Sequence, residues 1–179
     1  MSSITLILGG ARSGKSSHAL KLAEESRKPV TFIATAQAHD DEMSARIEKH
    51  KAERPANWET IELPLDIAPH VAQIQSKTVI LDCLTLWATN LMMQFVRDDL
   101  VDEVPFMRAA RAETEALLAA IRRTEQEWLV VSNEVGLGLV PPYQMGRVFR
   151  DALGWVNQRL AKEADSVVFM AAGIPMALK

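Results

Sequence analysis

Residues 9–16 read Gly9-Gly10-Ala11-Arg12-Ser13-Gly14-Lys15-Ser16, which is a complete G-x-x-x-x-G-K-[ST] phosphate-binding loop. An apolar run at residues 4–8 precedes the loop and predicts a strand, and the residues after it have helical spacing. Glycines let the backbone curl so that its N–H groups point at phosphate oxygens, and the helix adds its partially positive N-terminus. The Lys15 side chain would reach the β- and γ-phosphates, and the Ser16 hydroxyl would bind Mg²⁺. We therefore expect a nucleotide site here rather than a plain glycine-rich turn.

The composition is that of an ordinary globular protein. With 179 residues the chain can bury a sizeable core, and we expect a single domain over residues 1–179. The formal net charge of −3 provides no basic field that would attract nucleic acid. No apolar run approaches the roughly 20 residues that span a bilayer, and the first residues do not read as a secretory signal. The single cysteine, Cys83, follows an apolar run, so we expect a buried thiol rather than a nucleophile, in a cytoplasmic protein.

Apolar runs that predict strands alternate with segments of helical spacing. The expected strands are residues 4–8, 30–34, 78–81, 128–132 and 166–171. The expected helices are residues 16–26, 40–53, 84–97, 105–125 and 142–164, and residues 54–68 are expected to be extended. The apolar runs are mostly continuous, which is typical of strands covered on both faces. The sequence therefore predicts an α/β, P-loop NTPase-like domain whose mostly parallel sheet is flanked by helices and binds ligands at the carboxyl ends of its strands.

Two carboxylates follow expected strands and are candidates for the chemistry. Asp82 closes the third apolar run, where it would hold Mg²⁺ beside the phosphate loop, and the alternative is an N-cap of the next helix. Glu134 follows the fourth run in the cluster Ser132-Asn133-Glu134. It would orient or deprotonate an acceptor hydroxyl, and the alternative is a capping carboxylate in the turn before Gly136.

His50 stands among basic residues, which are Arg46, Lys49, Lys51 and Arg54. Such neighbours attract anions, and a neutral imidazole beside a triphosphate can act as a nucleophile toward phosphorus. On the residues alone a surface histidine is the favoured interpretation. His18 and His70 have no cysteine or histidine partner at metal-ligand spacing, so we expect no zinc site.

Further motifs follow the phosphate loop in order along the chain. They are Ile33-Ala34-Thr35-Ala36; Asp40-Asp41-Glu42-Met43 with Arg46-Ile47-x-x-His50 and Arg54-Pro55-x-x-Trp58; Leu81-Asp82-Cys83-Leu84-Thr85 with Thr89-Asn90-Leu91; Ser132-Asn133-Glu134-Val135-Gly136-x-Gly138-x-Val140-Pro141; and Phe149-Arg150-Asp151-x-x-Gly154-x-x-Asn157-Gln158. A phosphate loop alone is shared by many ATPases, but this combination is specific. Over nearly all of its length the chain resembles the bifunctional adenosylcobinamide kinase/adenosylcobinamide-phosphate guanylyltransferase family of cobalamin biosynthesis.

The resemblance implies two transferase reactions on one fold. In the first, an NTP phosphorylates adenosylcobinamide. In the second, a histidine attacks the α-phosphate of GTP, releases pyrophosphate and passes GMP to adenosylcobinamide phosphate, giving adenosylcobinamide-GDP. The resemblance implies that His50 is the guanylylated nucleophile, that GTP and ATP are substrates with Mg²⁺, that a corrinoid is the acceptor and that the chain forms a homotrimer. It also implies contacts with guanine nucleotide at Ala34, Thr35, Ala36, Lys51, Ala52, Glu53, Arg54, Glu62 and Asp82.

Three alternatives stay open on the sequence. The chain would be a small-molecule kinase without histidine chemistry, a regulatory module that binds a nucleotide without turnover, or a guanylyltransferase that has lost the kinase activity. The corrinoid contacts are also open. The apolar residues Trp87, Met92, Met93 and Phe95 would form either such a contact or part of the core or a subunit interface.

Overall fold

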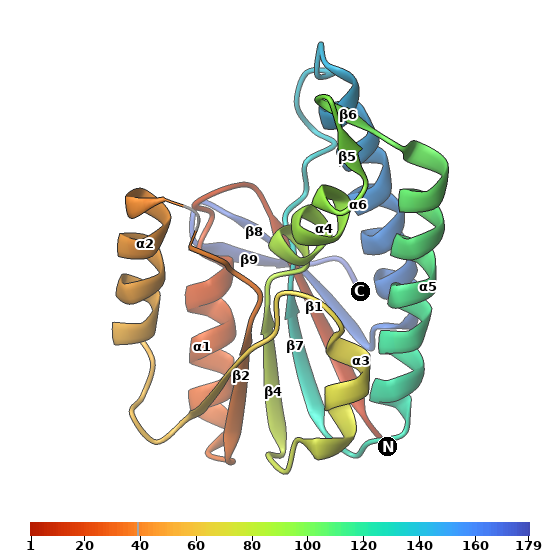
Figure 1. The fold of residues 1–179 in the computed structure, drawn as a ribbon. Helices are drawn as coiled ribbons and strands as arrows, with labels where there is room; N and C mark the ends of the chain where they lie inside the picture. Colours follow the sequence, from red (N-terminus) through yellow and green to blue (C-terminus); the bar gives the residue numbers. More distant parts are fainter. Residues whose placement is uncertain (39) are drawn as a thin grey trace.

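The computed structural model describes residues 1–38 and 40–179, and of residues 42 and 46 it describes the backbone but not the side chains. In this part of the chain a seven-stranded sheet runs through the centre of the molecule (Figure 1). The strands follow one another across the sheet as β3 (Glu59–Glu62), β2 (Val30–Ala34), β4 (Thr78–Asp82), β7 (Glu127–Val131), β1 (Ser3–Gly9), β8 (Ser166–Ala171) and β9 (Ile174–Ala177). Neighbouring strands pair in parallel, except that β8 and β9 pair antiparallel. The predicted α/β fold with a mostly parallel sheet is confirmed.

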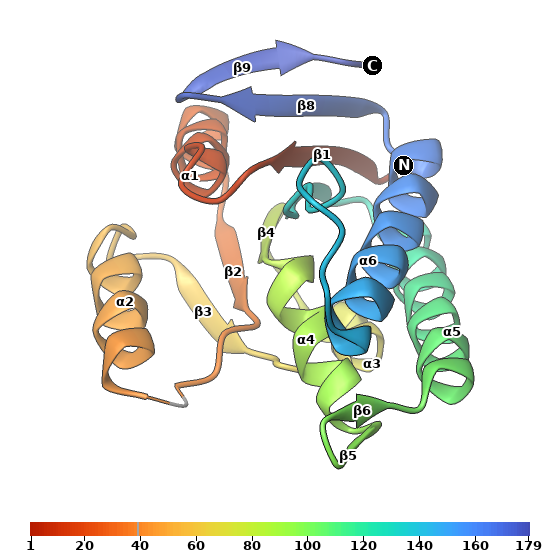
Figure 2. The same ribbon diagram turned by 90° about the horizontal axis from the view of Figure 1, so that it is seen from above.

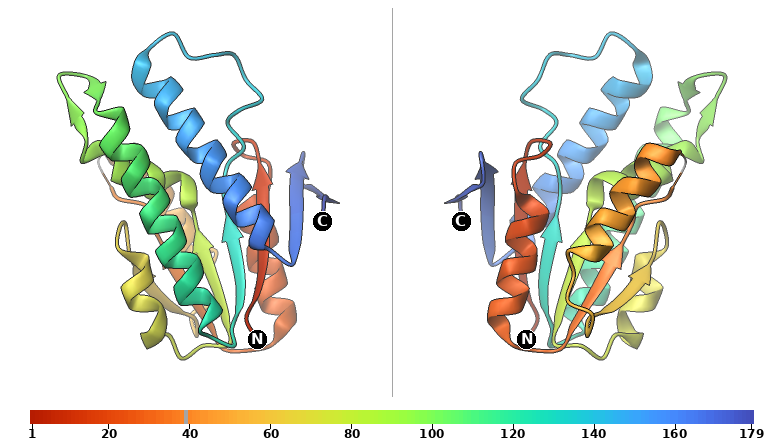
Figure 3. Two further views of the ribbon diagram at one scale, coloured as in Figure 1. Left: turned by 90° about the vertical axis from the view of Figure 1, so that its right-hand side faces the viewer. Right: turned by 90° about the vertical axis from the view of Figure 1, so that its left-hand side faces the viewer.

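Helices cover both faces of the sheet, as Figure 2 shows from above. One face carries α1 (Lys15–Ser26) and, beside β2 and β3, α2 (Asp41–Ala52). The other face carries α3 (Ile67–His70), the 3-10 turn η1 (Val71–Gln73), α4 (Leu84–Met93), α5 (Glu103–Arg122) and α6 (Gln144–Glu163). The two long helices of this second face, α5 and α6, pack side by side, as the left view of Figure 3 shows. No helix in the described ranges has the length and apolar character needed to cross a membrane.

The strands separate two apolar cores because successive side chains point to opposite faces. In β1, Leu6 and Leu8 pack toward the second face, and Ile7 lies between them in the core under α1. The same alternation places Ile80 of β4 and Leu129 of β7 in the core under α1. Both sets are fully buried, which explains why the strands read as continuous apolar runs.

Two strands lie at the edges of the sheet where the sequence predicts none. β3 has the sequence ETIE and is largely exposed, so it lacks the apolar signal of a central strand. β9 contains Pro175 and follows a tight turn from β8, in which Ala172 and Gly173 have positive φ. Strand propensity is weak at such positions, and the pairing of these strands depends on neighbours far along the chain or across a turn.

The expected helix over residues 84–97 is too long, since α4 ends at Met93. A short hairpin follows, in which β5 (Val96–Arg97) pairs with β6 (Leu100–Val101). Its two turn residues, Asp98 and Asp99, have φ of 49° and 60°. A two-residue hairpin turn with both φ values positive matches the twist of the strands, and aspartate accepts this conformation more easily than most residues.

The end of β1 approaches β8 so closely that it tolerates no side chain. Gly9 has a φ of 151°, and a Cβ there would lie 2.5 Å from the Met170 carbonyl oxygen and 2.7 Å from the Ser13 Oγ. Gly154, in the middle of α6, is the opposite case, because a Cβ there would meet no atom within 4 Å.

Substitution of these two glycines tests the described packing. We expect Gly9→Ala to lower the free energy of unfolding by about 2 kcal/mol, because the backbone of β1 or β8 must move. Gly154→Ala serves as the matched control and should raise it by about 0.5–1 kcal/mol, since alanine favours a helix interior. Urea unfolding followed by circular dichroism measures both, and a neutral Gly9→Ala would contradict the close approach of β1 to β8.

Candidate functional site

The phosphate-binding loop joins β1 to α1 as the sequence predicts. Gly14 is the N-cap of α1 with a φ of 93°, and its side of the loop faces the turn that carries Gly173. No side chain caps the first turn of α1, so in the described structure its N–H groups remain available to an anion. The Nζ of Lys15 donates a hydrogen bond to the Gly10 carbonyl oxygen at 2.6 Å, and the side chain is buried. The loop is thus held in a curled form with its lysine inside the curl.

A cavity of about 440 Å³ opens over this loop at the carboxyl ends of the strands. The loop itself contributes six predicted residues, namely Ala11, Arg12, Ser13, Gly14, Lys15 and Ser16. The other predicted residues that line the cavity come from β2 and the segment after it, from the end of α2 and just beyond it, and from the ends of β3 and β4. They are Ala34, Ala36, His50, Lys51, Arg54, Glu62 and Asp82. The structure therefore brings together residues that are up to 71 positions apart.

Helix α2 presents the candidate nucleophile to this cavity. Its N-cap is Asp40, whose side chain accepts a hydrogen bond from the Met43 N–H at 2.7 Å. Met43, Ile47 and His50 all line the cavity, because spacings of four and three residues place them on one face of the helix. The Nδ1 atom of His50 lies 3.7 Å from a carboxylate oxygen of Glu53.

Arg54 is the most unusual cation in the cavity. Its guanidinium lies over the Phe32 ring, with 3.6 Å between the guanidinium carbon and the ring centroid. Its Nε and Nη1 atoms are buried and have no hydrogen-bond partner in the described structure. Burial lowers the pKa of Arg54, while the charges of Asp82 and Glu62 oppose that shift. A desolvated guanidinium with unused donors is well suited to receive an anionic ligand.

Lys51 is held at the other side of the cavity by a carboxylate. Its Nζ lies 3.1 Å from an Oε1 of Glu62 at the end of β3, and the hydrogen bond to Glu62 raises the pKa of Lys51. Both side chains are substantially exposed, so the pair contributes little to stability and mainly orients the two groups. Glu62, the residue with the weakest sequence signal, is thus placed by a strand that the sequence did not predict.

Asp82 and Ser16 provide a donor set that fits magnesium. Burial raises the pKa of the Asp82 carboxyl, and the hydrogen bond with Ser16, followed by the charges of His50, Arg54 and Lys15, opposes this shift. A hydroxyl and a carboxylate in contact are the hard oxygen donors that Mg²⁺ prefers. The described residues contain no cluster of three acidic, histidine or cysteine ligands, so substrate phosphates and water would complete the coordination, as is usual for this ion.

Six predicted residues lie outside the lining of this cavity: Gly9, Gly10, Thr35, Ala52, Glu53 and Glu134. Thr35 is fully buried and has a structural role instead. Its Oγ1 donates to the Cys83 carbonyl oxygen at 2.7 Å and accepts from the Cys83 N–H at 2.8 Å. The Asn90 Nδ2 donates to the carbonyl oxygens of Thr35, at 2.8 Å, and Pro64, at 3.1 Å. Three strand ends around the cavity are therefore tied together by these side chains.

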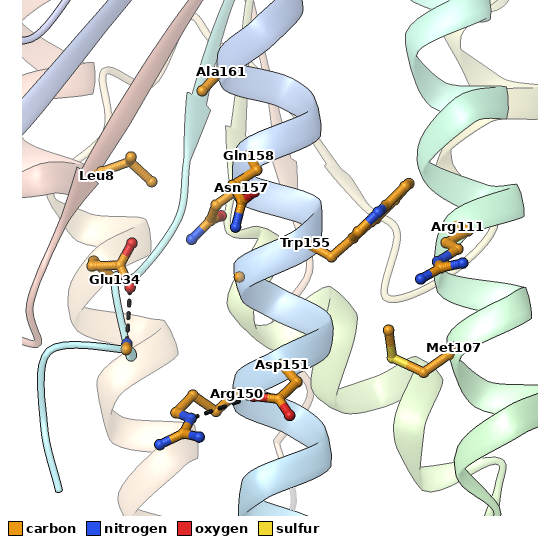
Figure 4. A pocket seen from close by; sticks show the side chains of 12 residues that line it. Leu8, Met107, Arg111, Glu134, Arg150, Asp151, Trp155, Asn157, Gln158 and Ala161 are labelled. Atoms are coloured by element: carbon orange, nitrogen blue, oxygen red, sulfur yellow. Dashed lines mark hydrogen bonds and ion pairs between the residues drawn. The ribbon is translucent and has the colours of Figure 1, made fainter. Parts of the chain in front are cut away.

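Glu134 does not share the crevice of the phosphate loop. Its backbone N–H donates to the Gly9 carbonyl oxygen at 3.1 Å, but its side chain lines a separate groove beside α6 (Figure 4). One carboxylate oxygen accepts a hydrogen bond from the Gly136 N–H at 2.8 Å, which is the turn-capping contact considered as the alternative. Glu134 lines this groove and is absent from the lining of the nucleotide cavity, whereas the residue before it, Asn133, lines that cavity.

Cys83 and the apolar residues considered as corrinoid contacts lie mostly in the interior. Cys83 is buried, and burial raises the pKa of its thiol to about 11, in agreement with an inert thiol. Trp87 and Met92 belong to the core, whereas Met93 is exposed. The sequence analysis missed Phe32 and Met43 as cavity residues. Phe32 reads only as a core strand residue, but the helical spacing of Met43 with His50 was a usable signal.

The parallel sheet, the loop between β1 and α1, and the cavity over that loop define a nucleotide-binding protein of the P-loop NTPase type. A family model described as cobinamide kinase / cobinamide phosphate guanyltransferase, CobU, matches residues 5–178. The chain is 45% identical to the bifunctional adenosylcobalamin biosynthesis protein CobP of Pseudomonas aeruginosa, over 97% of this chain and 96% of that protein. It is 42% identical to the protein CobU of Escherichia coli, which has the same bifunctional description, over 97% and 98% of the two chains. The chain therefore belongs to the CobU family of transferases.

Solved structures extend the likeness in fold alone. The crystal structure of the flagellar accessory protein FlaH from Methanocaldococcus jannaschii superposes with a TM-score of 0.51 at 14% identity, covering 99% of this chain and 78% of that one. At such low identity the likeness concerns the architecture and says nothing about substrates.

The role of Asn90 as a tie between strand ends is testable. We expect Asn90→Ala to lower the free energy of unfolding by about 2 kcal/mol, because two carbonyl groups lose their donor, and to weaken GTP binding. Thr89→Ala is the matched control, since the Thr89 Oγ1 donates to the Thr85 carbonyl oxygen one turn back in the same helix, and it should change stability by less than about 0.5 kcal/mol. Urea unfolding and GTP titration measure both effects, and an Asn90→Ala protein as stable as the control would remove the assigned role.

Proposed function

We propose that this chain phosphorylates adenosylcobinamide with an NTP and transfers GMP from GTP, through a guanylyl-histidine, to adenosylcobinamide phosphate, giving adenosylcobinamide-GDP. His50 and the phosphate loop line one cavity, and this arrangement is the main support for both reactions at one site. A triphosphate held by Lys15 and Ser16 then lies in the cavity that His50 faces. Membership of the CobU family supports both reactions.

In the kinase reaction the chain positions the nucleotide and neutralises its charge. Lys15 and the N–H groups of the loop bind the β- and γ-phosphates, and Ser16 and Asp82 would hold Mg²⁺. When bound, this ion neutralises charge on the phosphate oxygens. The acceptor hydroxyl forms a bond to the γ-phosphorus, the bond to the bridging oxygen breaks, and NDP leaves. The carboxylate of Glu134, a residue whose backbone N–H bonds to the Gly9 carbonyl oxygen, would orient the hydroxyl and take its proton.

In the guanylyl transfer, a ring nitrogen of His50 forms a bond to the α-phosphorus of GTP, and pyrophosphate leaves with the electrons of the broken P–O bond. The carboxylate of Glu53 lies 3.7 Å from Nδ1, so we assign the attack to the other ring nitrogen, Nε2. Arg54, with its unused donors, and Lys51 stabilise the phosphate charge. A phosphate oxygen of the acceptor then displaces the histidine, so the ring returns to its starting state.

Two further expectations stay predictions. One, from the composition and the single cysteine, is a location in the cytoplasm, and the other, from the family resemblance, is a homotrimer. The outer strand β9 exposes Ile174 and Met176, and Leu178 just after it is also exposed, so contact with a second subunit would cover an apolar edge.

The histidine intermediate is tested by covalent labelling. Incubation with Mg²⁺ and GTP radiolabelled at the α-phosphate, followed by denaturing electrophoresis, should give a labelled protein whose label is acid-labile and stable to alkali. His50→Ala should lose the label completely, because its nucleophile is absent. His70→Ala is the matched control and should keep it, since His70 is not among the residues that line the cavity and its Nδ1 bonds to the Asp66 carbonyl oxygen. An unlabelled wild-type protein that still phosphorylates cobinamide would be a kinase without guanylyltransferase activity.

The shared phosphate loop is tested by Lys15→Ala. Both phosphorylation and labelling should fall by about 100-fold or more, because one cation serves both reactions. Lys21→Ala, which removes an exposed lysine of the same helix, is the control and should leave both rates unchanged. If either activity survived in Lys15→Ala, two separate nucleotide sites would be needed.

A further inference from the structure

A second hollow lies on the α5 and α6 side of the sheet, away from the nucleotide cavity. It is an open groove of about 560 Å³ that crosses α6 (Figure 4). Leu8 and Glu134 lie on one side of α6 in that view, and Met107, Trp155 and Arg111 lie on the other. Gly154 lies in the lining and has open space where a side chain would be, so the groove passes over the helix at this glycine.

The groove and the nucleotide cavity meet at the tip of β7. Asn133 lines the nucleotide cavity, and the next residue, Glu134, lines the groove. Leu8, which also lines the groove, directly precedes the first glycine of the phosphate loop. A molecule in the groove is therefore close to the loop but approaches it from the face opposite to α2 and His50.

The charges of the groove differ from those of the nucleotide cavity. Arg111 and Arg150 are balanced by Glu134 and Asp151, and Arg150 and Asp151 form an ion pair at 3.5 Å. In the nucleotide cavity the described cations Arg12, Lys15, Lys51 and Arg54 outnumber the carboxylates Glu62 and Asp82. A nucleoside triphosphate thus has a clear preference for the nucleotide cavity. The groove suits a ligand without strong net charge.

The polar side chains of the groove are those that recognise amides. Gln158 is exposed in the groove and offers a carbonyl and an NH₂ group, the arginines offer donors, and the carboxylates accept. An amide group of a ligand has an N–H donor and a carbonyl acceptor, so it needs both an acceptor and a donor in the groove. Trp155, whose ring lies 5.3 Å from the Arg111 guanidinium, and Met107 add flat apolar surface. The loop that leaves the groove after Gly136 exposes Leu137 and Leu139 beside it.

We propose that this groove is the acceptor site, where the amide-bearing edge of the corrinoid binds with its hydroxyl or phosphate arm directed over the tip of β7 toward the phosphate loop. The inference rests on the proposed function. It goes beyond that function by assigning the acceptor to α5 and α6, and by giving Arg111, Trp155 and Gln158 the role of binding residues. The alternative contact at Trp87 and Met92 has no support, because both residues are buried.

The test uses variants that either block the groove or remove one of its hydrogen-bond donors, and that leave the nucleotide cavity unchanged. Gly154→Leu adds bulk where a Cβ meets no atom, so the helix is kept while the groove is blocked. Arg111→Ala removes a donor. The controls are Ala116→Leu, which adds a leucine side chain, and Arg108→Ala, which removes an arginine. Both residues are exposed positions of α5 outside the groove. For each protein we would measure the KM for adenosylcobinamide, the binding of cobinamide by equilibrium dialysis, and labelling by GTP without any corrinoid.

We expect Gly154→Leu and Arg111→Ala to raise the KM and the dissociation constant for the corrinoid by about 10-fold, with labelling by GTP unchanged and both controls like wild type. An unchanged corrinoid affinity in both groove variants would overturn the acceptor site. A change in oligomeric state in these variants, seen by sedimentation, would assign the groove to a contact between copies and also overturn it. Absence of labelling and phosphorylation in the wild-type protein would instead reject the proposed function itself.

Discussion

The close contact between the phosphate loop and the turn after β8 is the constraint on which the site depends. Gly9 lies against the Met170 carbonyl, Gly14 lies against Gly173, and the Gly173 N–H donates to the Ser13 carbonyl at 3.0 Å. The loop is therefore supported from outside by β8 and its turn, and from inside by Lys15. Its N–H groups keep their direction because neither side has room to relax, and a preorganised loop avoids an ordering cost when phosphate binds.

The features that the sequence predicted best are those with a local cause. The strand, loop and helix around residues 9–16 follow from adjacent residues, and so do the central strands, whose apolar runs reflect burial on both faces. Edge strands have no such signature. β3 is polar and exposed, and β9 pairs only by folding back over a turn, so their positions are determined by tertiary contacts.

In the site, too, residues that belong to a local motif were predicted better than those placed by tertiary contacts. Lys15, Ser16 and Asp82 were predicted from single motifs, and the structure places them in one cavity. The stacking of Arg54 on Phe32 joins the segment after α2 to β2, and no spacing in the sequence encodes a contact between them. For Glu134 the motif was informative but its direction was not, because a change of one residue at a strand end moves a side chain to the opposite face. The sequence thus predicted the central strands and the phosphate loop, but not the directions of the side chains that follow the strands.

The position of the β7 tip explains how one nucleotide site can serve two reactions in the proposed scheme. His50 approaches the triphosphate from the α2 side of the sheet, and the groove opens on the α6 side, so the histidine and the acceptor do not compete for one space. In the first reaction the acceptor has only to reach the terminal phosphate. In the second it must reach farther, to the guanylyl group on His50, but by then its arm is longer by the phosphate that it has received. In this scheme phosphorylation comes first, because the phosphate that it adds is the group that accepts GMP in the second reaction.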